Sequence, residues 1–316
     1  MASIIPVFVP HEGCPCQCVF CNQRTIAGQK QHMTAQQARN ILQTGLSVLP
    51  AMHPAPQAAF YGGSFTAIPQ EQQEALLAVT DELIAQGKLS SVRCSTRPDA
   101  ITPEILQRMK QHHVTTIELG AQSMARPVLE ASGRGHTAQD TIDAAQRIKQ
   151  AGISLILQMM VGLPEDTRER TRETARRIAA CRPDGVRIYP TAVLPDTPLY
   201  IMWQQGVYMP LTNETAAEWC ADALEIFLAE QIPVIRIGLN PTEELDSTVA
   251  AGAYHPAMGE LVYSAVWYRR LRQRAQQGEM QLCVPKRELS RAIGHKRCNI
   301  LRLQQEFPNI RIVPMG

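Results

Sequence analysis

The sequence predicts an α/β fold, a partial (β/α)6-type barrel followed by a small C-terminal α+β extension. Short apolar runs alternate with stretches of helical spacing six or seven times, and such alternation requires parallel strands joined by right-handed crossovers. Residues 154–161 are apolar apart from Gln158, as in a strand buried on both faces. Six or seven units fit a barrel that stays open on one side better than a full eight-unit barrel.

The elements of the barrel follow from these apolar patterns, taken in chain order. The predicted strands are short apolar runs at 4–9, 58–61, 92–95, 116–119, 154–161, 186–189 and 234–237. The predicted helices cover 34–49, 71–86, a segment that begins at Pro103, 126–131, 137–151, 167–181 and 213–231. Thr34 is expected to cap the first of these helices, and Pro103 suits a first helical turn.

The pattern changes after about residue 252, where a helix at 258–277, a strand at 280–284 and two short helices around Gly294 are expected. We therefore predict a barrel domain over 1–250 and a basic extension over 251–316. Residues 269–316 hold 11 Lys and Arg against 3 Asp and Glu, a net charge of +8, while the rest of the chain carries −6. A polyanion-binding tail and a solvated basic surface are both consistent with this asymmetry.

Composition limits the function classes. The chain has 316 residues, 45% of them hydrophobic, and a net charge of only +2, so a large core is expected and the overall charge indicates no partner. No run approaches 18 apolar residues and the first ten residues do not resemble a signal peptide, so a cytoplasmic protein without a membrane span is expected. Four of the nine cysteines crowd between Cys14 and Cys21, which favours metal binding over disulfides.

The crowded cysteines directly follow the first predicted strand, at the barrel end where active residues gather. Cys14, Cys18 and Cys21 have the spacing C-x3-C-x2-C. Thiolates are the ligands of iron–sulfur clusters, and three of them leave one iron of a cubane open. Cys16 offers a fourth thiol for a zinc or electron-transfer site, although no second C-x2-C pair exists to build a zinc ribbon.

The C-x3-C-x2-C segment, with Phe20 before its third cysteine, resembles the signature of the radical S-adenosylmethionine superfamily. The resemblance implies a [4Fe–4S] cluster held by Cys14, Cys18 and Cys21, with Cys16 as a neighbour that does not bind. It implies that the open iron chelates S-adenosylmethionine, which is cleaved reductively to a 5′-deoxyadenosyl radical. It also implies an electron donor such as flavodoxin or ferredoxin.

Further cofactor contacts are expected where the second and third strands end. Paired glycines let a ligand approach the backbone closely, and the resemblance implies that Gly62, Gly63 and Ser64 receive the methionine amino group. Arg97 can bind a carboxylate or form an ion pair with Asp99.

Polar residues also lie at the ends of the fourth and fifth strands. Gln122 and Ser123 suit ribose hydroxyls or loop capping. Arg134 and His136 lie where they can reach cofactor or substrate, between glycines that also suit a turn. The amide of Gln158 interrupts an apolar strand, and burying it is costly without a partner; the resemblance places this strand against adenine.

Several motifs together resemble the catalytic subunit of Elongator, which acts on the wobble uridine of tRNA. They lie at 95–99, 118–123, 134–137, 159–164 and 187–191, and the resemblance covers about residues 1–240. The roughly 65 residues after Gly252 are too few for the acetyltransferase domain of that subunit, so carboxymethylation from acetyl-CoA is not expected. His255 and Glu260 are expected either at the border of the substrate site or at a turn and helix start.

The sequence therefore predicts a radical S-adenosylmethionine enzyme that modifies a tRNA base, with tRNA held through the basic extension. Two alternatives stay open. One is a radical enzyme for a small molecule or a porphyrin-like metabolite. The other is a non-catalytic module that binds an iron–sulfur cluster or zinc, for which Cys16 is the main support.

Overall fold

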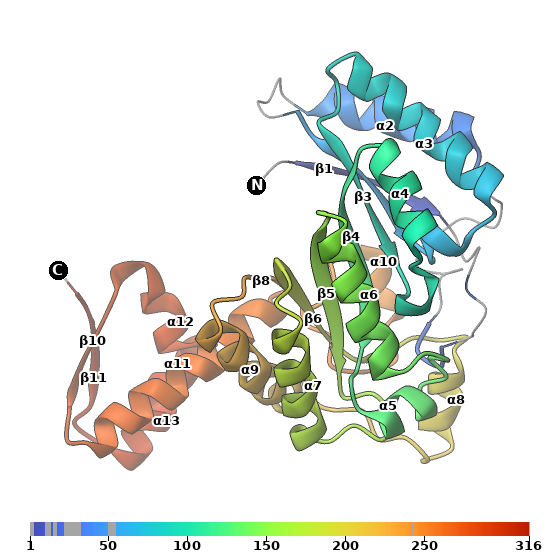
Figure 1. The fold of residues 1–316 in the computed structure, drawn as a ribbon. Helices are drawn as coiled ribbons and strands as arrows, with labels where there is room; N and C mark the ends of the chain where they lie inside the picture. Colours follow the sequence, from blue (N-terminus) through green and yellow to red (C-terminus); the bar gives the residue numbers. More distant parts are fainter. Residues whose placement is uncertain are drawn as a thin grey trace.

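The computed structural model describes residues 3–9, 14, 18–21, 33–49, 55–241 and 243–315. Seven parallel strands form one curved sheet in the order β1-β2-β3-β4-β5-β6-β8. The strands are β1 (Ile4–Val9), β2 (Gln57–Gly62), β3 (Ser91–Thr96), β4 (Val114–Gln122), β5 (Ser154–Val161), β6 (Gly185–Pro190) and β8 (Val234–Ile237). Because β1 and β8 form the two edges, the barrel is open on one side (Figure 1), which confirms the predicted fold class.

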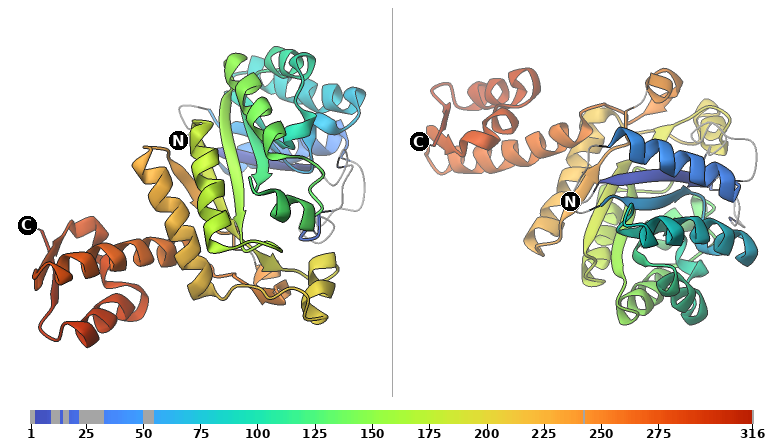
Figure 2. Two further views of the ribbon diagram at one scale, coloured as in Figure 1. Left: turned by 60° about the horizontal axis from the view of Figure 1, so that its bottom comes forward. Right: turned by 90° about the horizontal axis from the view of Figure 1, so that it is seen from above.

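Helices cover the convex side of this sheet (Figure 2). They are α2 (Ala35–Val48), α3 (Gln70–Ala85), α4 (Pro103–Gln111), α6 (Ala138–Gln150), α7 (Arg168–Ala180) and α9 (Asn213–Ala229). Three shorter helices, α5 (Arg126–Ala131), α8 (Pro198–Gln204) and α10 (Glu243–Thr248), lie in the segments that follow β4, β7 (Ala192–Val193) and β8. Thr34 caps α2 as predicted, since its side chain accepts a hydrogen bond from the Gln37 amide. In the described part of the chain, no helix has both the length and the apolar character needed to cross a membrane.

The main core lies between the sheet and these helices. Strand residues such as Val7, Phe60, Ile117 and Leu157 are fully buried there. Alternate residues of the same strands point to the concave side, because successive side chains of a strand face opposite ways. The prediction of a fifth strand buried on both faces is therefore only half correct, since Gln158 on the concave side is half-buried.

The C-terminal extension has its own small core and projects from the barrel (Figure 1). It comprises α11 (Met258–Gln276), β10 (Gln281–Val284), α12 (Leu289–Ile293), α13 (Cys298–Glu306) and β11 (Arg311–Pro314). Strand β11 pairs in parallel with β10 and was not predicted, and neither was the short antiparallel pair of β7 (Ala192–Val193) and β9 (Ala251–Gly252).

A buried carboxylate joins the extension to the barrel. Asp222 on α9 lies 2.6 Å from Arg168 Nε on α7 and 2.7 Å from Arg269 Nη1 on α11. Arg269 also pairs with Glu218 and Glu225 of α9. The first helix of the extension is therefore fixed along α9.

Candidate functional site

The glycine pair at the end of β2 brings two predicted site residues together. Gly62 has φ +110°, and a Cβ built there would lie 2.7 Å from the Val9 carbonyl oxygen, so the backbone approach of β1 and β2 requires glycine. The Gly63 amide donates to that same carbonyl at 3.0 Å. Ser64 is buried beyond the pair, and its Oγ lies 3.3 Å from Cys14 Sγ. The end of β2 and the first cysteine are thus in direct contact.

The other two predicted cluster ligands lie on one turn, in which the Cys21 amide donates to the Cys18 carbonyl at 3.0 Å. Cys18 is buried, and Cys14 and Cys21 are half-buried. The described cysteines form no disulfide, so their sulfurs are free to bind a metal. Within the described ranges, no three His, Cys, Asp or Glu side chains are grouped closely enough to hold a metal. Cys16 lies outside the described residues, and the choice of ligands stays a prediction.

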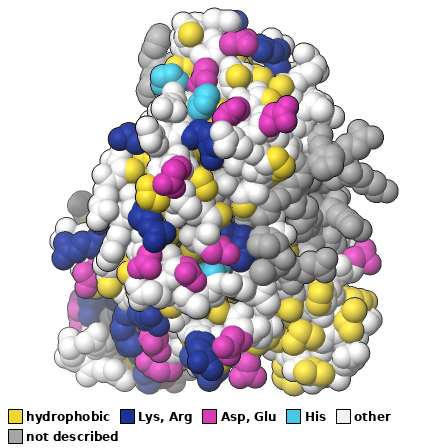
Figure 3. Space-filling model, turned by 45° about the vertical axis from the view of Figure 1, so that its right-hand side comes forward, with side chains coloured by type: hydrophobic (Ala, Val, Ile, Leu, Met, Phe, Trp, Pro, Cys, Tyr) yellow, Lys and Arg dark blue, Asp and Glu magenta, His cyan; other side chains and the backbone are white. Residues whose placement is uncertain are grey.

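An apolar wall supports this turn from the side of α8. Val19 and Phe20 pack on a cluster that contains Val193, Leu199 and Tyr208, and the Leu199 amide donates to the Val19 carbonyl at 2.8 Å. Apolar side chains continue onto the surface over α8, at the lower right of Figure 3. The aromatic residue before the third cysteine therefore anchors the turn between Cys18 and Cys21 to the protein.

Arg134 connects the end of β4 to the cysteine turn. The residue is only 6% exposed. Nη1 donates to Cys18 Sγ at 3.2 Å, and Nη2 donates to the Gly120 carbonyl of β4 at 2.6 Å. A fixed guanidinium at this distance suits an ionised sulfur, the form in which cysteine binds metals.

Buried polar atoms without partners surround Arg134. Gln122 follows a bulge in β4 with φ 62°, and its Oε1 has no hydrogen-bond partner among the described residues. The same holds for Nε of Arg134 and for both ring nitrogens of His136. Each such buried atom costs about 1–3 kcal/mol when unsatisfied. Several of them beside a cysteine sulfur fit a site that a polar ligand completes.

Arg97 reaches the same region but is held by protein groups. It donates to both carboxylate oxygens of Asp99 at 2.9 Å, and its Nη2 donates to the Arg134 carbonyl at 2.7 Å. The predicted alternative of an ion pair with Asp99 is therefore present. Burial, together with Arg134 and Arg97, lowers the pKa of His136 to about 4, so this imidazole is neutral at pH 7. Arg97 as a cofactor contact stays a prediction.

Ser123 lies deeper in the loop that follows β4. Its Oγ accepts a hydrogen bond from the Ala125 amide at 3.1 Å and lies 3.2 Å from Thr174 Oγ1 of α7. In this arrangement Ser123 shapes the loop, and its predicted ribose contact remains untested.

A buried carboxylate on β4 is the site feature that the sequence analysis missed. Glu118 is fully buried. It accepts hydrogen bonds from Tyr61 Oη at 2.8 Å, Arg93 Nη1 at 3.2 Å, Gln158 Nε2 at 3.0 Å and Arg187 Nε at 2.8 Å. We expected the Gln158 amide to be costly to bury without a partner, and Glu118 is that partner. The available signal was a single charged residue in each of three otherwise uncharged strands, namely Arg93, Glu118 and Arg187.

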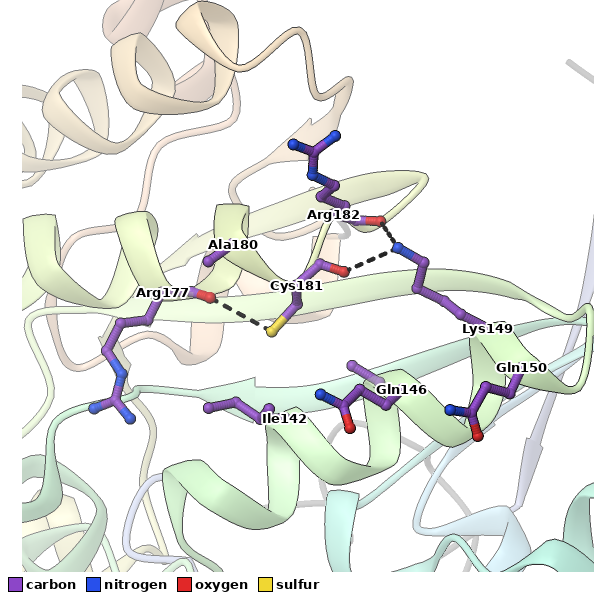
Figure 4. A pocket seen from close by; sticks show the side chains of 9 residues that line it. Ile142, Gln146, Lys149, Gln150, Arg177, Ala180, Cys181 and Arg182 are labelled. Atoms are coloured by element: carbon purple, nitrogen blue, oxygen red, sulfur yellow. Dashed lines mark hydrogen bonds between the residues drawn. The ribbon is translucent and has the colours of Figure 1, made fainter.

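A pocket on the outer surface lies away from these residues, between α6 and α7 (Figure 4). Its apolar floor includes Ile142 and Cys181, and Lys149 on its rim donates to the Cys181 and Arg182 carbonyls. Both helices end there, at the barrel end opposite to the carboxyl ends of the strands. It is therefore separate from the candidate site.

Comparisons with known proteins agree with this arrangement. Residues 8–178 match the model of the radical SAM superfamily, and residues 183–267 match that of the Radical_SAM C-terminal domain. A curated relative from Methanocaldococcus jannaschii, "tRNA uridine(34) acetyltransferase", is 32% identical over 183 residues, which are 57% of this chain and 33% of that protein. Elongator complex protein 3 of Saccharomyces cerevisiae is 31% identical over 185 residues, 52% of this chain and 33% of that protein.

The chain thus spans about a third of the length of the curated relatives that it matches. Among solved structures, an N-terminally truncated Elp3 of the archaeon Methanocaldococcus infernus superposes with a TM-score of 0.65 at 22% identity. The superposition covers 91% of this chain and 69% of that one, and it supports the fold over nearly the whole length.

Proposed function

Since the chain belongs to the radical SAM superfamily and is one of its enzymes, we propose that it modifies a base of tRNA. The observation that carries this proposal is the similarity to relatives whose names specify tRNA uridine(34) and Elongator. These relatives are 32% and 31% identical to the chain over 183 and 185 residues. We further propose a cytoplasmic location, where tRNA is available.

The residues around the cysteine turn fit the cofactors of this superfamily. Cys14, Cys18 and Cys21 would hold a [4Fe–4S] cluster, and Gly62, Gly63, Ser64, Arg97, Gln122, Ser123, Arg134 and Gln158 are the proposed contacts of S-adenosylmethionine. The unsatisfied polar atoms of Gln122 and Arg134 support a polar ligand there. When bound, the cluster supplies the electron for cleavage of S-adenosylmethionine, and that electron comes from a donor such as flavodoxin or ferredoxin.

The basic extension supports an RNA substrate. Several of its arginines are held by carboxylates, including Arg291, which pairs with Glu260 at 2.9 Å. Lys286, Lys296 and Arg297 are exposed and have no carboxylate partner in the described part of the chain. Exposed cations of this kind can contact phosphates, whereas paired arginines are already neutralised.

The test of the proposal is anaerobic reconstitution of the cluster, followed by an assay for 5′-deoxyadenosine with and without bulk tRNA. We expect tRNA to stimulate formation of the product, and we expect the protein to bind tRNA at low salt with an affinity that falls as salt rises. The double variant Lys296→Glu, Arg297→Glu should weaken this binding, and Arg126→Glu on α5 serves as the control. Product formation that responds to a small-molecule extract but not to tRNA would contradict the proposal.

Arg134 gives a prediction about the cluster itself. Its hydrogen bond to Cys18 Sγ places a positive charge beside a proposed ligand. Hydrogen bonds and charge at the sulfurs set cluster potentials, and a cation favours the more negative, reduced state. Arg134→Gln should therefore lower the midpoint potential in an anaerobic redox titration, whereas Arg126→Gln, at an exposed arginine, should not. An unchanged midpoint potential in Arg134→Gln would show that Arg134 does not tune the cluster.

A further inference from the structure

The charged residues of the barrel sheet gather on its concave face. The seven strands contain four charged residues, namely Arg93 on β3, Glu118 on β4, Arg187 on β6 and Arg236 on β8. Among the strand residues, three arginines therefore face one carboxylate, a net charge of +2. Such a face attracts anions.

Glu118 is shared by two of these arginines. Arg93 Nη1 donates to its Oε1 at 3.2 Å, and Arg187 donates from Nε to Oε2 at 2.8 Å and from Nη2 to Oε1 at 3.1 Å. Tyr61 and Gln158 occupy further acceptor positions of the same carboxylate. Glu118 thus holds both guanidiniums in place and has little capacity left to neutralise a third cation.

Arg236 is that third cation. It is the register partner of Arg187 in the pairing of β6 with β8. Its Nε and Nη2 donate to the Gly238 and Leu239 carbonyls at 3.0 and 3.1 Å, which fixes the side chain without neutralising it. Within the described residues, no carboxylate pairs with Arg236, and its Nη1 makes no hydrogen bond.

The fractional exposure of these groups shows which side of the Glu118 network faces the interior of the half-barrel. Glu118 is fully buried beneath the network, while Arg93, Arg187, Arg236 and Tyr189 are half-buried. The cationic side of the network therefore faces the interior of the half-barrel. Partly desolvated cations without a counter-charge are unfavourable, and an anion placed beside Arg236 and Arg187 would relieve that cost.

We propose that the concave face is a binding site for an oxyanion, a phosphate or a carboxylate, carried by the molecule on which the enzyme acts. Arg236 is its principal contact, and Arg187, positioned by Glu118, is the second. The site rests on the proposed function only in that the anion belongs to the substrate or a co-substrate. A phosphate would come from the target nucleotide, and a carboxylate from a separate small acid.

The test uses the reconstituted protein and three probes, uridine 5′-monophosphate, uridine and acetate, in calorimetric titrations without oxygen. We expect at least one of the two anions to bind, and Arg236→Gln to weaken it about 10-fold or more, the loss expected for a charge-assisted hydrogen bond. Arg236→Lys should retain part of the affinity, and Arg270→Gln, at an exposed arginine on α11, should retain all of it. Selective binding of the nucleotide or of acetate identifies the anion as phosphate or carboxylate.

Equal affinity of wild-type and Arg236→Gln protein for the bound anion, or binding of neither anion, would overturn the proposal. Thermal unfolding of Arg236→Gln checks that the variant is folded. The assay for tRNA-stimulated 5′-deoxyadenosine separates the two proposals. Stimulation without anion binding rejects the oxyanion site alone, and anion binding without stimulation rejects only the tRNA substrate.

Discussion

Replacing Cys18 by alanine is expected to abolish cluster binding and S-adenosylmethionine cleavage together. With three protein thiolates for four irons, the loss of one leaves two irons without a protein ligand. Arg134 donates a hydrogen bond to the Cys18 sulfur, so the variant also leaves the Arg134 guanidinium without this acceptor. Cys14→Ala and Cys21→Ala should behave alike. Iron and sulfide content, visible absorption and 5′-deoxyadenosine formation after anaerobic reconstitution measure the effect.

Two other cysteines serve as controls for this series. Cys16→Ala is expected to retain both the cluster and cleavage, because Cys16 is not among the proposed ligands. Cys298→Ala, in the C-terminal extension, should also leave both unchanged. A four-iron cluster with undiminished cleavage in Cys18→Ala would contradict the ligand assignment, and loss of the cluster in Cys16→Ala would require a different set.

Replacing Glu118 by alanine is expected to destabilise the folded protein by about 3–5 kcal/mol, the usual cost of removing one partner of a buried ion pair. The change leaves Arg93 and Arg187 without their carboxylate and removes an acceptor from Tyr61 and Gln158. Thermal unfolding of reconstituted protein at neutral pH measures the loss. Glu306→Ala, which removes an exposed pair with Arg272 and an acceptor of Tyr268 Oη, should cost much less.

The effect of Glu118→Ala should depend on pH in one direction. Burial raises the pKa of Glu118, but Arg187 and the hydrogen bonds from Arg187, Tyr61 and Gln158 outweigh it and hold the pKa below its usual value. The stabilisation is therefore fully present above the unfolded pKa of about 4.3 and is lost as pH falls through the lower folded value. A stability difference near zero at pH 7, or one that grows in acid, would contradict the ion-pair account.

The strands of the barrel could be predicted because each is an apolar run with a helix after it. The structure extends several of them, for example from 116–119 to Val114–Gln122, because residues on either side of the apolar run continue the pairing with β3 and β5. The two-residue strands β7 and β9 could not be predicted, since two residues carry no periodic signal. Strand β11 was missed because Arg311 and Pro314 break its apolar pattern and its partner β10 is distant in sequence.

At the site, position along the chain predicted that Ser64, Arg134 and the cysteines lie at the same end of the barrel, because strand ends of a parallel barrel meet at one edge. The contacts of Ser64 with Cys14 and of Arg134 with Cys18 needed the structure. The Glu118 network needed the structure. Each of its members interrupts a different strand, and only the register of β3, β4, β5 and β6 shows that they converge on one carboxylate. Arg97 donates hydrogen bonds both to Asp99 and to the Arg134 carbonyl. This pair of contacts depends on loop geometry and likewise needed the structure.

The most direct test of the central claim is electron paramagnetic resonance of the reduced, reconstituted protein, recorded before and after addition of S-adenosylmethionine. The account predicts the spectrum of a [4Fe–4S] cluster that changes when S-adenosylmethionine is added, because Cys14, Cys18 and Cys21 leave one iron for it to bind. A four-iron spectrum that is indifferent to S-adenosylmethionine, or a protein that takes up zinc and no cluster, would contradict it.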